Sequence, residues 1–476
     1  MNQQIKDALI RKLGKEKVKD DAETLKRFAR DITENPEGKP DLVVFAEFAE
    51  DVRNTLVEAN RLKVPVVPMM ANTNLGGLAI PQKGGIVLDL SRMNRILEVN
   101  EEDQYAVIEP GVRWQDISEH LEKNHPGMRF AYPLSPPDTG VLPNFLMDGL
   151  ANLSLRHGSS THWINGLEAI LPDGSLLKTG HFAYGGIPCT HSPFPKLEGV
   201  FCGFAGTTGV VVKMSVQLWP EKKYRSQLFL LAYDVDHAFG LIKDLIREEF
   251  ADDLGTLSLA SGKMLFGDYR PVYKDPNEPV LFCYLDFSSN FEFDFKSKRR
   301  IIDETVKRHR DQGAFFDGPL DLDDLVRLEP RFAKFAKFPT RLDFLLDHQG
   351  GGLTWVGTYG PLSRFEEGFK KGSEIMLRHG LPPVIVARPM QGGHFGVLRW
   401  ISVFDRDNEE DCRKVHAVNV DLADMAVNLG FFPYKTPQWV WDRYRDRLDP
   451  GFRRVIMDIK KTMDPAGIMN PGHLEL

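Results

Sequence analysis

Short apolar runs typical of β-strands alternate with helical patterns over the first 220 residues. Residues 50–63 repeat apolar side chains at helical spacing, and residues 114–123 do the same. The β-branched runs between and around them predict strands. These are 41–46 (DLVVFA), 64–68 (VPVVP), 85–90 (GIVLDL), 105–111 (YAVIEPG) and 210–220 (VVVKMSVQLWP), together with a hairpin over 163–180 that turns at Pro172-Asp173-Gly174.

After Pro220 the predicted elements become longer. Strands of six to ten residues now alternate with long amphipathic helices. The pattern predicts an α+β domain in which an antiparallel sheet carries its helices on one face. The helices are expected near 237–249, 296–309, 362–379 and 409–429, and the strands near 280–287, 353–358, 383–389 and 396–404.

Length and composition narrow the class of protein. A chain of 476 residues exceeds the ~250–300 residues that one core supports, so two domains are expected. The net charge of −7, with both signs interspersed, argues against a nucleic-acid-binding surface. Four cysteines without a CxxC pair favour a reducing, cytoplasmic setting over a disulfide framework or zinc ribbon. There is no apolar run of the ~20 residues that span a bilayer, and the charged N-terminus lacks a signal-peptide core.

Several motifs are missing, and their absence excludes functions. The sequence has no GxGxxG after a strand, no GxxxxGK[ST], no GxSxG and no HExxH. Residues 203–209 have the spacing GxxGxxG, which differs from the dinucleotide fingerprint. Nicotinamide binding by a doubly wound domain, nucleotide hydrolysis and nucleophile-elbow esterases are therefore disfavoured.

The loop between the strands 64–68 and 85–90 is rich in Asn and Gly. Such a loop can turn consecutive N–H groups toward an anion, and its glycines allow close approach of a ligand. A pyrophosphate is the natural guest, and a plain connecting loop is the alternative. The residues concerned are Asn72, Thr73, Asn74, Leu75, Gly76 and Gly77.

Taken together, several segments resemble one known family. They are PVVPMMANTNLGGLAIPQKGGIVLDLSRMNRILEVNEEDQYAVIEPGVRWQDI, GLEAILPDGSLLKTG, FCGFAGTTGVVVKMSVQLWP and the ending MDPAGIMNPG. In this order they are similar to the p-cresol methylhydroxylase and vanillyl-alcohol oxidase family of FAD-linked oxidoreductases, over nearly the whole chain.

The resemblance implies an α+β fold with a bipartite PCMH-type FAD-binding domain of two α+β subdomains and an inserted cap domain with an antiparallel sheet. Residues 1–222 would bind FAD, 223–430 would form the substrate-binding cap, and 431–476 would return to the FAD domain. Besides residues 72–77 at the pyrophosphate, the flavin and adenosine would lie along Pro136, Gly149, Gly206, Thr207, Gly209 and Val210, although each of these also suits simple turn chemistry.

The family's phenol-oxidising members bind the substrate as a phenolate through a Tyr-Arg pair and a tyrosine in the pyrophosphate loop. Here Tyr434 and Lys435 occupy the positions of the pair, and Leu75 stands where the loop tyrosine would be. A lysine stabilises an oxyanion as a point charge rather than a bidentate fork. Asp148 is the candidate base beside the flavin. A solvated Lys435 and an Asp148 in an ordinary turn are the alternatives.

The segment around residue 350 bears on how FAD is held. The linking histidine of vanillyl-alcohol oxidase matches Gly352, no tyrosine lies in 341–349, and His348 is near but out of register. The resemblance therefore implies non-covalent FAD, with a tether through His348 left open.

A competing branch comprises the D-2-hydroxyacid dehydrogenases, whose GHxGDGNxH run binds a divalent metal. Residues 392–400 (GGHFGVLRW) keep one histidine of that run, so no metal site is expected. His394 and Arg399 are instead expected to face the flavin from the cap sheet, with a core histidine as the alternative for His394. By period-two alternation His394, Gly396 and Leu398 share one face.

The prediction is thus FAD-dependent oxidation of a 4-hydroxybenzylic or alkylphenol-like substrate by hydride transfer to flavin N5, with Tyr434, Lys435, Asp148, His394 and Arg399 as catalytic candidates. A D-2-hydroxyacid dehydrogenase and a non-catalytic flavin-fold subunit of an electron-transfer complex are the alternatives. The expected partners are a small aromatic substrate, a cytochrome or other electron-acceptor subunit, and a second copy of the chain, with neither nucleic acid nor membrane.

Overall fold

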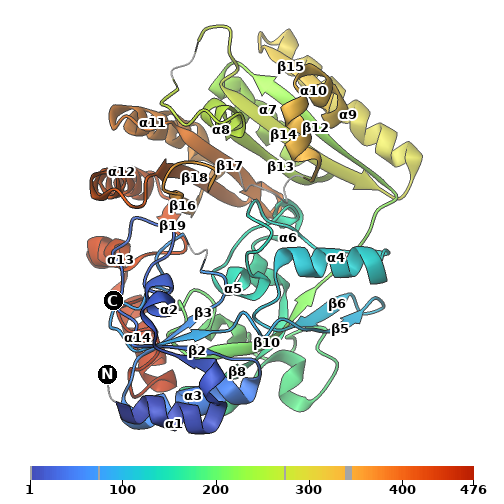
Figure 1. Cartoon of the computed structure of the whole chain (residues 1–476). Helices are drawn as coiled ribbons and strands as arrows, with labels where there is room; N and C mark the ends of the chain where they lie inside the picture. The colour runs from blue at the N-terminus through green and yellow to red at the C-terminus, as the bar shows by residue number, and fades with distance from the viewer. Residues whose placement is uncertain (1–2, 73–74, 273–274, 338–345) are drawn as a thin grey trace.

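The computed structural model describes residues 3–72, 75–272, 275–337 and 346–476. Figure 1 shows two lobes, one built from the N-terminal half and the last segment of the chain, the other from the middle. Three sheets of four, five and eight strands organise them, with a further two-stranded ribbon. The α+β class predicted from the sequence is confirmed.

The first subdomain is built on the sheet β1-β2-β4-β3, in which β4 pairs in parallel with both β2 and β3. Its helices α1 and α3 bury Ile5, Leu9, Val52 and Leu56 against the sheet. The elements are α1 (Gln3–Leu13), β1 (Val18–Lys19), α2 (Ala22–Arg27), β2 (Leu42–Phe45), α3 (Ala49–Leu62), β3 (Val66–Met69) and β4 (Ile86–Asp89).

The second subdomain is an antiparallel sheet of order β5-β6-β10-β8-β9, and the helix α4 packs on it through Trp114, Ile117 and Leu121. The strands 105–111 and 210–217 and the hairpin over 163–180 are found as predicted. The elements are β5 (Ile96–Asn100), β6 (Tyr105–Ile108), α4 (Trp114–Asn124), β7 (Met128–Arg129), α5 (Val141–Leu146), α6 (Ser154–His157), β8 (Ile164–Ile170), β9 (Leu176–Lys178), β10 (Val210–Gln217) and β11 (Trp219–Pro220).

The middle of the chain forms a lobe around one antiparallel sheet of order β15-β12-β14-β13-β17-β18-β16-β19. The four predicted helices and four predicted strands are all present. The elements are β12 (Tyr224–Ala232), α7 (Val235–Arg247), β13 (Ala251–Ser258), α8 (Leu259–Leu265), β14 (Leu281–Ser289), α9 (Glu292–Asp311), β15 (Phe316–Asp321), α10 (Leu322–Leu328), β16 (Gly352–Gly360), α11 (Phe365–Arg378), β17 (Val384–Met390), β18 (Phe395–Phe404) and α12 (Glu409–Asn428).

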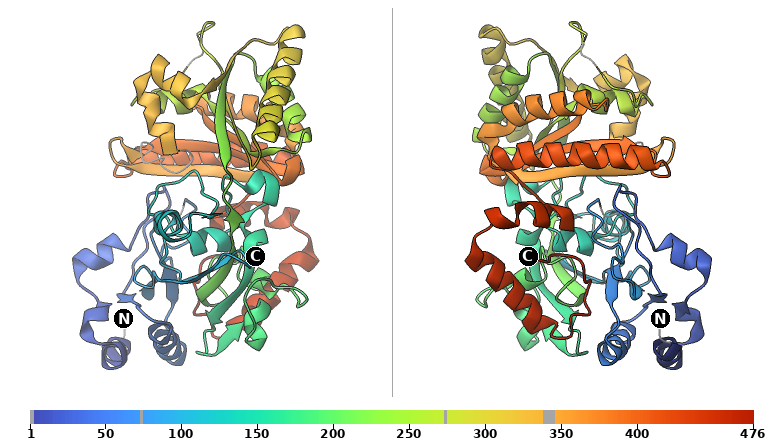
Figure 2. Two further views of the ribbon diagram at one scale, coloured as in Figure 1. Left: turned by 90° about the vertical axis from the view of Figure 1, so that its right-hand side faces the viewer. Right: turned by 90° about the vertical axis from the view of Figure 1, so that its left-hand side faces the viewer.

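The two faces of this sheet have different neighbours. The main core packs α7, α9, α11 and α12 against one face, for example Phe239, Ile302, Phe369 and Leu422. The other face lies against the lobe built from the N-terminal half and the last segment of the chain, as Figure 2 shows. A smaller apolar cluster there joins Val386 and Ile401 of the sheet to Leu75 and Leu134 of the lower lobe. This face of the sheet therefore forms one wall of any site that lies between the two lobes.

The last segment returns to the first subdomain. β19 (Phe432–Pro433) adds to the sheet edge beside β16, and α13 (Gln438–Tyr444) and α14 (Pro450–Met463) lead back down. Val66 of β3 then donates to the Ile468 carbonyl at 2.8 Å. The Asn470 amide donates to the carbonyls of Leu78 at 2.9 Å and Ala205 at 2.7 Å, joining both subdomains.

Two features bear on the environment of the protein. The four cysteines, all within the described residues, form no disulfide. In the described part of the chain, no helix has both the length and the apolar character needed to cross a membrane.

Candidate functional site

A long groove runs between the two subdomains and ends under the middle sheet. It is lined by β3 and the loop after it, by the segment 134–147, by the turn 205–211 and by residues of β16 and the C-terminal segment. The structure thereby brings together many of the residues that the sequence predicts for FAD. Those lining the groove are Asn72, Leu75, Pro136, Gly206, Gly209 and Val210, with Lys435 at its end.

The loop after β3 has the backbone that a cradle needs. Asn72 and Gly77 both have positive φ, at 54° and 68°, and Leu75, Gly76 and Gly77 are buried. The Asn72 amide donates to the Arg30 carbonyl at 2.7 Å, which leaves its buried Oδ1 without a protein partner. Thr73 and Asn74 lie outside the described residues.

The glycines of the turn 203–209 are required by its shape. Gly206 has φ +71°, and a Cβ there would lie 2.8 Å from Pro68 Cγ. Gly209 has φ +148°, and its Cβ would lie 3.0 Å from the Ile170 carbonyl oxygen. Thr207 is buried and donates to the Phe204 carbonyl at 2.6 Å, so it stabilises the turn rather than pointing into the groove. The backbone can therefore approach a ligand closely here.

Lys435 closes the groove at the cap end. It has φ +52° and donates from Nζ to Asn144 Oδ1 of α5 at 3.1 Å. Gly149 is necessary for this contact, since a Cβ there would lie 2.2 Å from the same Asn144 oxygen. Burial, and secondarily the Arg399 guanidinium, lower the pKa of Lys435 to about 7.

Arg399 reaches the same place from β18. Its guanidinium lies over the Trp355 ring at 3.9 Å from the ring centroid and donates to the Tyr434 hydroxyl. Burial raises the pKa of that phenol, and Arg399 opposes the rise. The Tyr434 ring in turn stacks on Tyr359 at 4.5 Å between centroids.

The charges of Lys435 and Arg399 are not neutralised by protein. Among the described residues neither of the two makes an ion pair with a carboxylate. Asn144 Nδ2, Trp355 Nε1 and Arg399 Nε are moreover buried donors without a partner. A buried cation without an anion is costly, so this end of the groove is built to receive an anionic or acceptor-rich ligand.

Two sequence-predicted residues lie differently from the rest. The carboxylate of Asp148 accepts from Thr161 Oγ1 at 2.6 Å, while its carbonyl accepts from the Tyr359 hydroxyl. His394 is exposed in the turn between β17 and β18, outside the groove. The expectation that it faces the flavin, or is a core histidine, is wrong. Gly396 and Leu398, two and four residues further on, pack on the helix-covered face, and Arg399 points the opposite way.

Comparison with known proteins bears on the cofactor. Residues 40–180 match the family described as FAD binding domain. Over its full length the chain superposes on p-cresol methylhydroxylase with substrate bound, with a TM-score of 0.87 at 18% identity and covering 96% of that chain. It also superposes on 4-ethylphenol oxidase from Gulosibacter chungangensis, with a TM-score of 0.85 at 18% identity, covering 99% of this chain and 96% of that one.

Sequence relatives differ in the substrates that their names give. The flavoprotein subunit of 4-cresol dehydrogenase (hydroxylating) from Pseudomonas putida is 26% identical, covering 92% of this chain and 88% of the relative. Mitochondrial D-lactate dehydrogenase (cytochrome) from Arabidopsis thaliana is 24% identical, covering 91% and 73%. Glycolate oxidase subunit GlcD from Bacillus subtilis is 28% identical over about half of each chain, 51% and 50%.

The chain is an FAD-dependent oxidoreductase with a PCMH-type FAD-binding domain.

The groove of this flavoprotein suits FAD. Gly206 and Gly209 line the groove without side chains, so a ligand can lie against their backbone. Asn72 Oδ1, which has no hydrogen-bond partner among the described residues, belongs to the loop expected to hold the pyrophosphate. His348 does not line the groove; its ring lies 5.3 Å from that of Tyr269. The expectation of a non-covalently held flavin stays a prediction.

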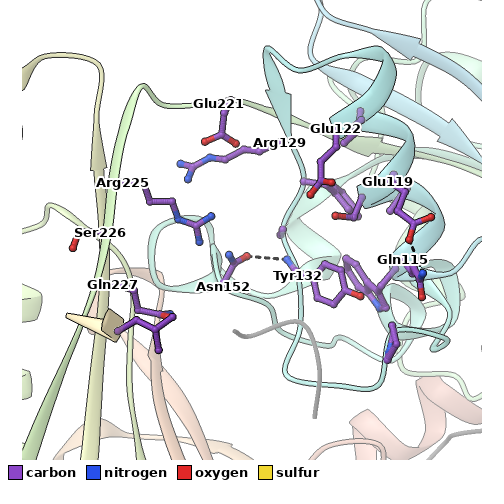
Figure 3. A pocket seen from close by; sticks show the side chains of 18 of the residues that line it. Gln115, Glu119, Glu122, Arg129, Tyr132, Asn152, Glu221, Arg225, Ser226 and Gln227 are labelled. Carbon is purple, nitrogen blue, oxygen red and sulfur yellow. Dashed lines mark hydrogen bonds between the residues drawn. The ribbon is translucent and has the colours of Figure 1, made fainter. Parts of the chain in front are cut away.

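A second cavity of the flavoprotein, of about 700 Å³, lies between α4 on one side and the beginnings of β12 and α10 on the other (Figure 3). Arg129 and Arg225 extend into it from opposite lobes. Arg129 pairs with the buried Asp252 at 3.3 Å, and Arg225 pairs with the buried Asp286. These guanidinium groups are therefore already neutralised, in contrast to Lys435 and Arg399.

Three further residues of the flavoprotein's site are not among the catalytic or cofactor-binding residues predicted from the sequence. Trp355 and Tyr359 share one face of β16 with Gly357, whose Cβ would meet both Trp355 and Tyr434, and strand alternation could have placed them there. Asn144 belongs to no recognised motif, and only its contact with Lys435 in the structure indicates a role for it.

Proposed function

We propose that the protein oxidises an aromatic substrate of the 4-hydroxybenzylic or alkylphenol type at a C–H bond. The observation that carries the proposal is a pair of cations, the partly buried Lys435 and the buried Arg399, which make no ion pair with a carboxylate of the described residues and stand beside the Tyr434 hydroxyl. The aromatic rings of Trp355, Tyr359 and Tyr434 supply flat apolar walls for such a ring.

Bound FAD supplies the acceptor for the hydride. Tyr434 and Lys435 would hold the substrate oxygen and stabilise the negative charge that develops on it. Arg399 keeps the Tyr434 hydroxyl oriented, because its guanidinium is itself fixed against Trp355. Lys435 can act as a cation only while protonated, so we expect activity to decline as pH rises above about 7.

We propose Asp148 as the proton acceptor. No carboxylate of the described residues lines the groove, and Asp148 lies immediately behind it, one contact from Tyr359. Its bond with Thr161 would have to exchange for one with the substrate.

Oxidation of a D-2-hydroxy acid is the second candidate function. The same two cations suit a carboxylate, and relatives include D-lactate dehydrogenase and D-2-hydroxyglutarate dehydrogenase. For either substrate we infer a homodimer in a reducing compartment, in keeping with the free cysteines, and a cytochrome or similar protein as electron acceptor. The acceptor is suggested by the word cytochrome in the name of the Arabidopsis relative.

A substrate panel separates the candidates. Flavin-loaded protein is mixed under nitrogen with 4-hydroxybenzyl alcohol, 4-ethylphenol, D-lactate or glycolate, and flavin bleaching is followed by absorbance. Benzyl alcohol, which lacks the phenolic oxygen, is the matched control. We expect bleaching by the phenols and none by benzyl alcohol. Bleaching by D-lactate or glycolate alone would replace the proposal with its competitor.

A further inference from the structure

Tyr359 bonds from the cap sheet to the backbone of the FAD-binding lobe behind the groove, and Arg388 of β17 makes a second such bond nearby, to the Ala151 carbonyl at 2.9 Å. It projects from β16, stacks on Tyr434 with the two ring planes 18° apart, and donates its hydroxyl to the Asp148 carbonyl. The residue is partly buried, and burial raises the pKa of its phenol well above the usual range. Its hydroxyl therefore stays a donor at any working pH.

The carbonyl that Tyr359 contacts belongs to a tight turn after α5. Asp148 has φ +48°, a conformation that costs a non-glycine residue free energy unless contacts hold it. Inside the turn the Asp148 amide donates to the Phe145 carbonyl at 3.0 Å and the Gly149 amide to the Asn144 carbonyl at 2.9 Å. The turn is thus constrained both from within and by the cap.

The same turn holds the catalytic cation. Asn144 begins it, and the Asn144 side-chain oxygen is the acceptor for Lys435 at 3.1 Å. Lys435 follows Tyr434, on which Tyr359 stacks. The contacts consequently form a closed circuit that crosses the lobe interface twice, once through the Tyr359 hydroxyl and once through the Lys435 ammonium.

We propose that Tyr359 is a positioning residue whose hydroxyl ties the cap sheet to the 144–149 turn and so fixes the Lys435 ammonium against Asn144, away from water. The inference rests on the proposed function only in taking Lys435 as the cation of the substrate site. Nothing in the circuit requires a particular substrate.

The circuit has a measurable electrostatic consequence. The groups around the Lys435 ammonium are Arg399 from β18, the rings of Trp355 and Tyr434, and Glu34, which lines the same small cavity. Burial is the larger cause of the lowered pKa of Lys435, and repulsion by Arg399 is the smaller. If the turn loosens and water enters, the first cause weakens while the second persists, so the pKa of Lys435 rises toward its ordinary value.

Tyr359→Phe tests this, because it keeps the ring and removes one oxygen atom. Tyr233→Phe is the matched control. It also removes one partly buried hydrogen bond, which the Tyr233 hydroxyl donates to the Asp317 carboxylate at 2.7 Å, but at the far edge of the sheet. Two readouts need no substrate. Hydrogen exchange of the peptide covering 144–150 reports on the turn, and the pH dependence of Lys435 acetylation by acetic anhydride, read by mass spectrometry, reports its pKa.

In Tyr359→Phe we expect exchange in 144–150 to quicken by on the order of threefold or more. The apparent pKa of Lys435 should rise by about one unit. Tyr233→Phe should change neither. With a substrate from the panel, kcat should fall roughly tenfold in Tyr359→Phe, with a smaller change in KM. Tyr359→Leu, which also removes the stack, should enlarge each effect.

Unchanged exchange and an unchanged pKa of Lys435 in Tyr359→Phe would overturn the proposal, even if kcat fell. The same shifts in Tyr233→Phe would also overturn it, because they would indicate general softening of the lobe. If no compound of the panel bleaches the flavin, the proposed function fails while these two readouts still decide the role of Tyr359.

Discussion

Replacing Lys435 by methionine should make the enzyme slower and the protein more stable. Methionine keeps an unbranched side chain of similar length, so the packing around Trp355 and Tyr434 is preserved while the charge is removed. A hydrogen bond to a charged group is worth about 1.5–3 kcal/mol, and its loss in the transition state corresponds to a rate lower by roughly 10- to 150-fold.

The effect on stability follows from proton linkage. The pKa of Lys435 is about 7 in the folded protein and 10.5, its ordinary value, in the unfolded chain. Below pH 7 both states hold the proton, and the full cost of burying the charge is present. Between 7 and 10.5 the folded state loses the proton while the unfolded state keeps it, so the stability of the wild type rises with pH. Above 10.5 the cost has vanished.

The size of the effect can be worked from these values. The difference of 10.5 − 7, or about 3.5 units at about 1.4 kcal/mol each, sets a ceiling of about 5 kcal/mol for the cost at pH 6. At pH 9 the remaining 10.5 − 9, about 1.5 units, corresponds to about 2 kcal/mol. Lys435→Met should therefore raise the free energy of unfolding by up to about 3 kcal/mol more at pH 6 than at pH 9.

The assay is the thermal unfolding midpoint of flavin-loaded wild type and variant at pH 6 and pH 9, followed by tryptophan fluorescence. Lys461→Met, at an exposed position of the same chain, is the matched control and should shift the midpoint equally at both pH values. A midpoint difference for Lys435→Met that is the same at pH 6 and pH 9, or a loss of stability at pH 6, would refute the account of a buried, uncompensated ammonium.

Three further predictions concern other parts of the site. Gly206→Ala should lower the flavin content of the purified protein by an order of magnitude or more, because it forces a Cβ against Pro68 at positive φ. Gly199→Ala, which has open space around the new Cβ, is the control and should keep its flavin. Equal absorbance at 450 nm for the two variants would contradict this prediction. Asp148→Asn, which tolerates the left-handed backbone, should slow flavin reduction at least tenfold with FAD retained, and full activity would reassign the base. His394→Ala should leave kcat and KM unchanged, since the side chain is exposed outside the groove; a tenfold loss would return it to the site.

The sequence predicted most elements of the fold because their apolar periodicity matches their burial. It failed at β13, whose sequence ADDLGTLS resembles a polar loop. The strand is nevertheless central, because Asp252 is neutralised by Arg129 and Arg156, and Asp253 by Arg388 at 2.8 Å. Such compensation comes from segments about a hundred residues or more away, so no local pattern contains it.

The sequence also predicted part of the candidate site. Tyr434, Lys435 and Arg399 were expected near the flavin, and the structure places them in mutual contact. For His394 the parity of the strand was misjudged, because it and Arg399 are five residues apart and cannot share a face. Asn144 and the turn behind it are defined by tertiary contacts alone.

The closure of the groove by the C-terminal segment dictates an order of assembly. Asn470 donates to the carbonyls of Leu78 and Ala205, and Val66 donates to that of Ile468, so these residues wait for partners that are synthesised 265 to about 400 residues later. Until those partners exist, the groove in the amino-terminal half has an open side. Stable cofactor loading is therefore expected only after the C-terminal segment has been made.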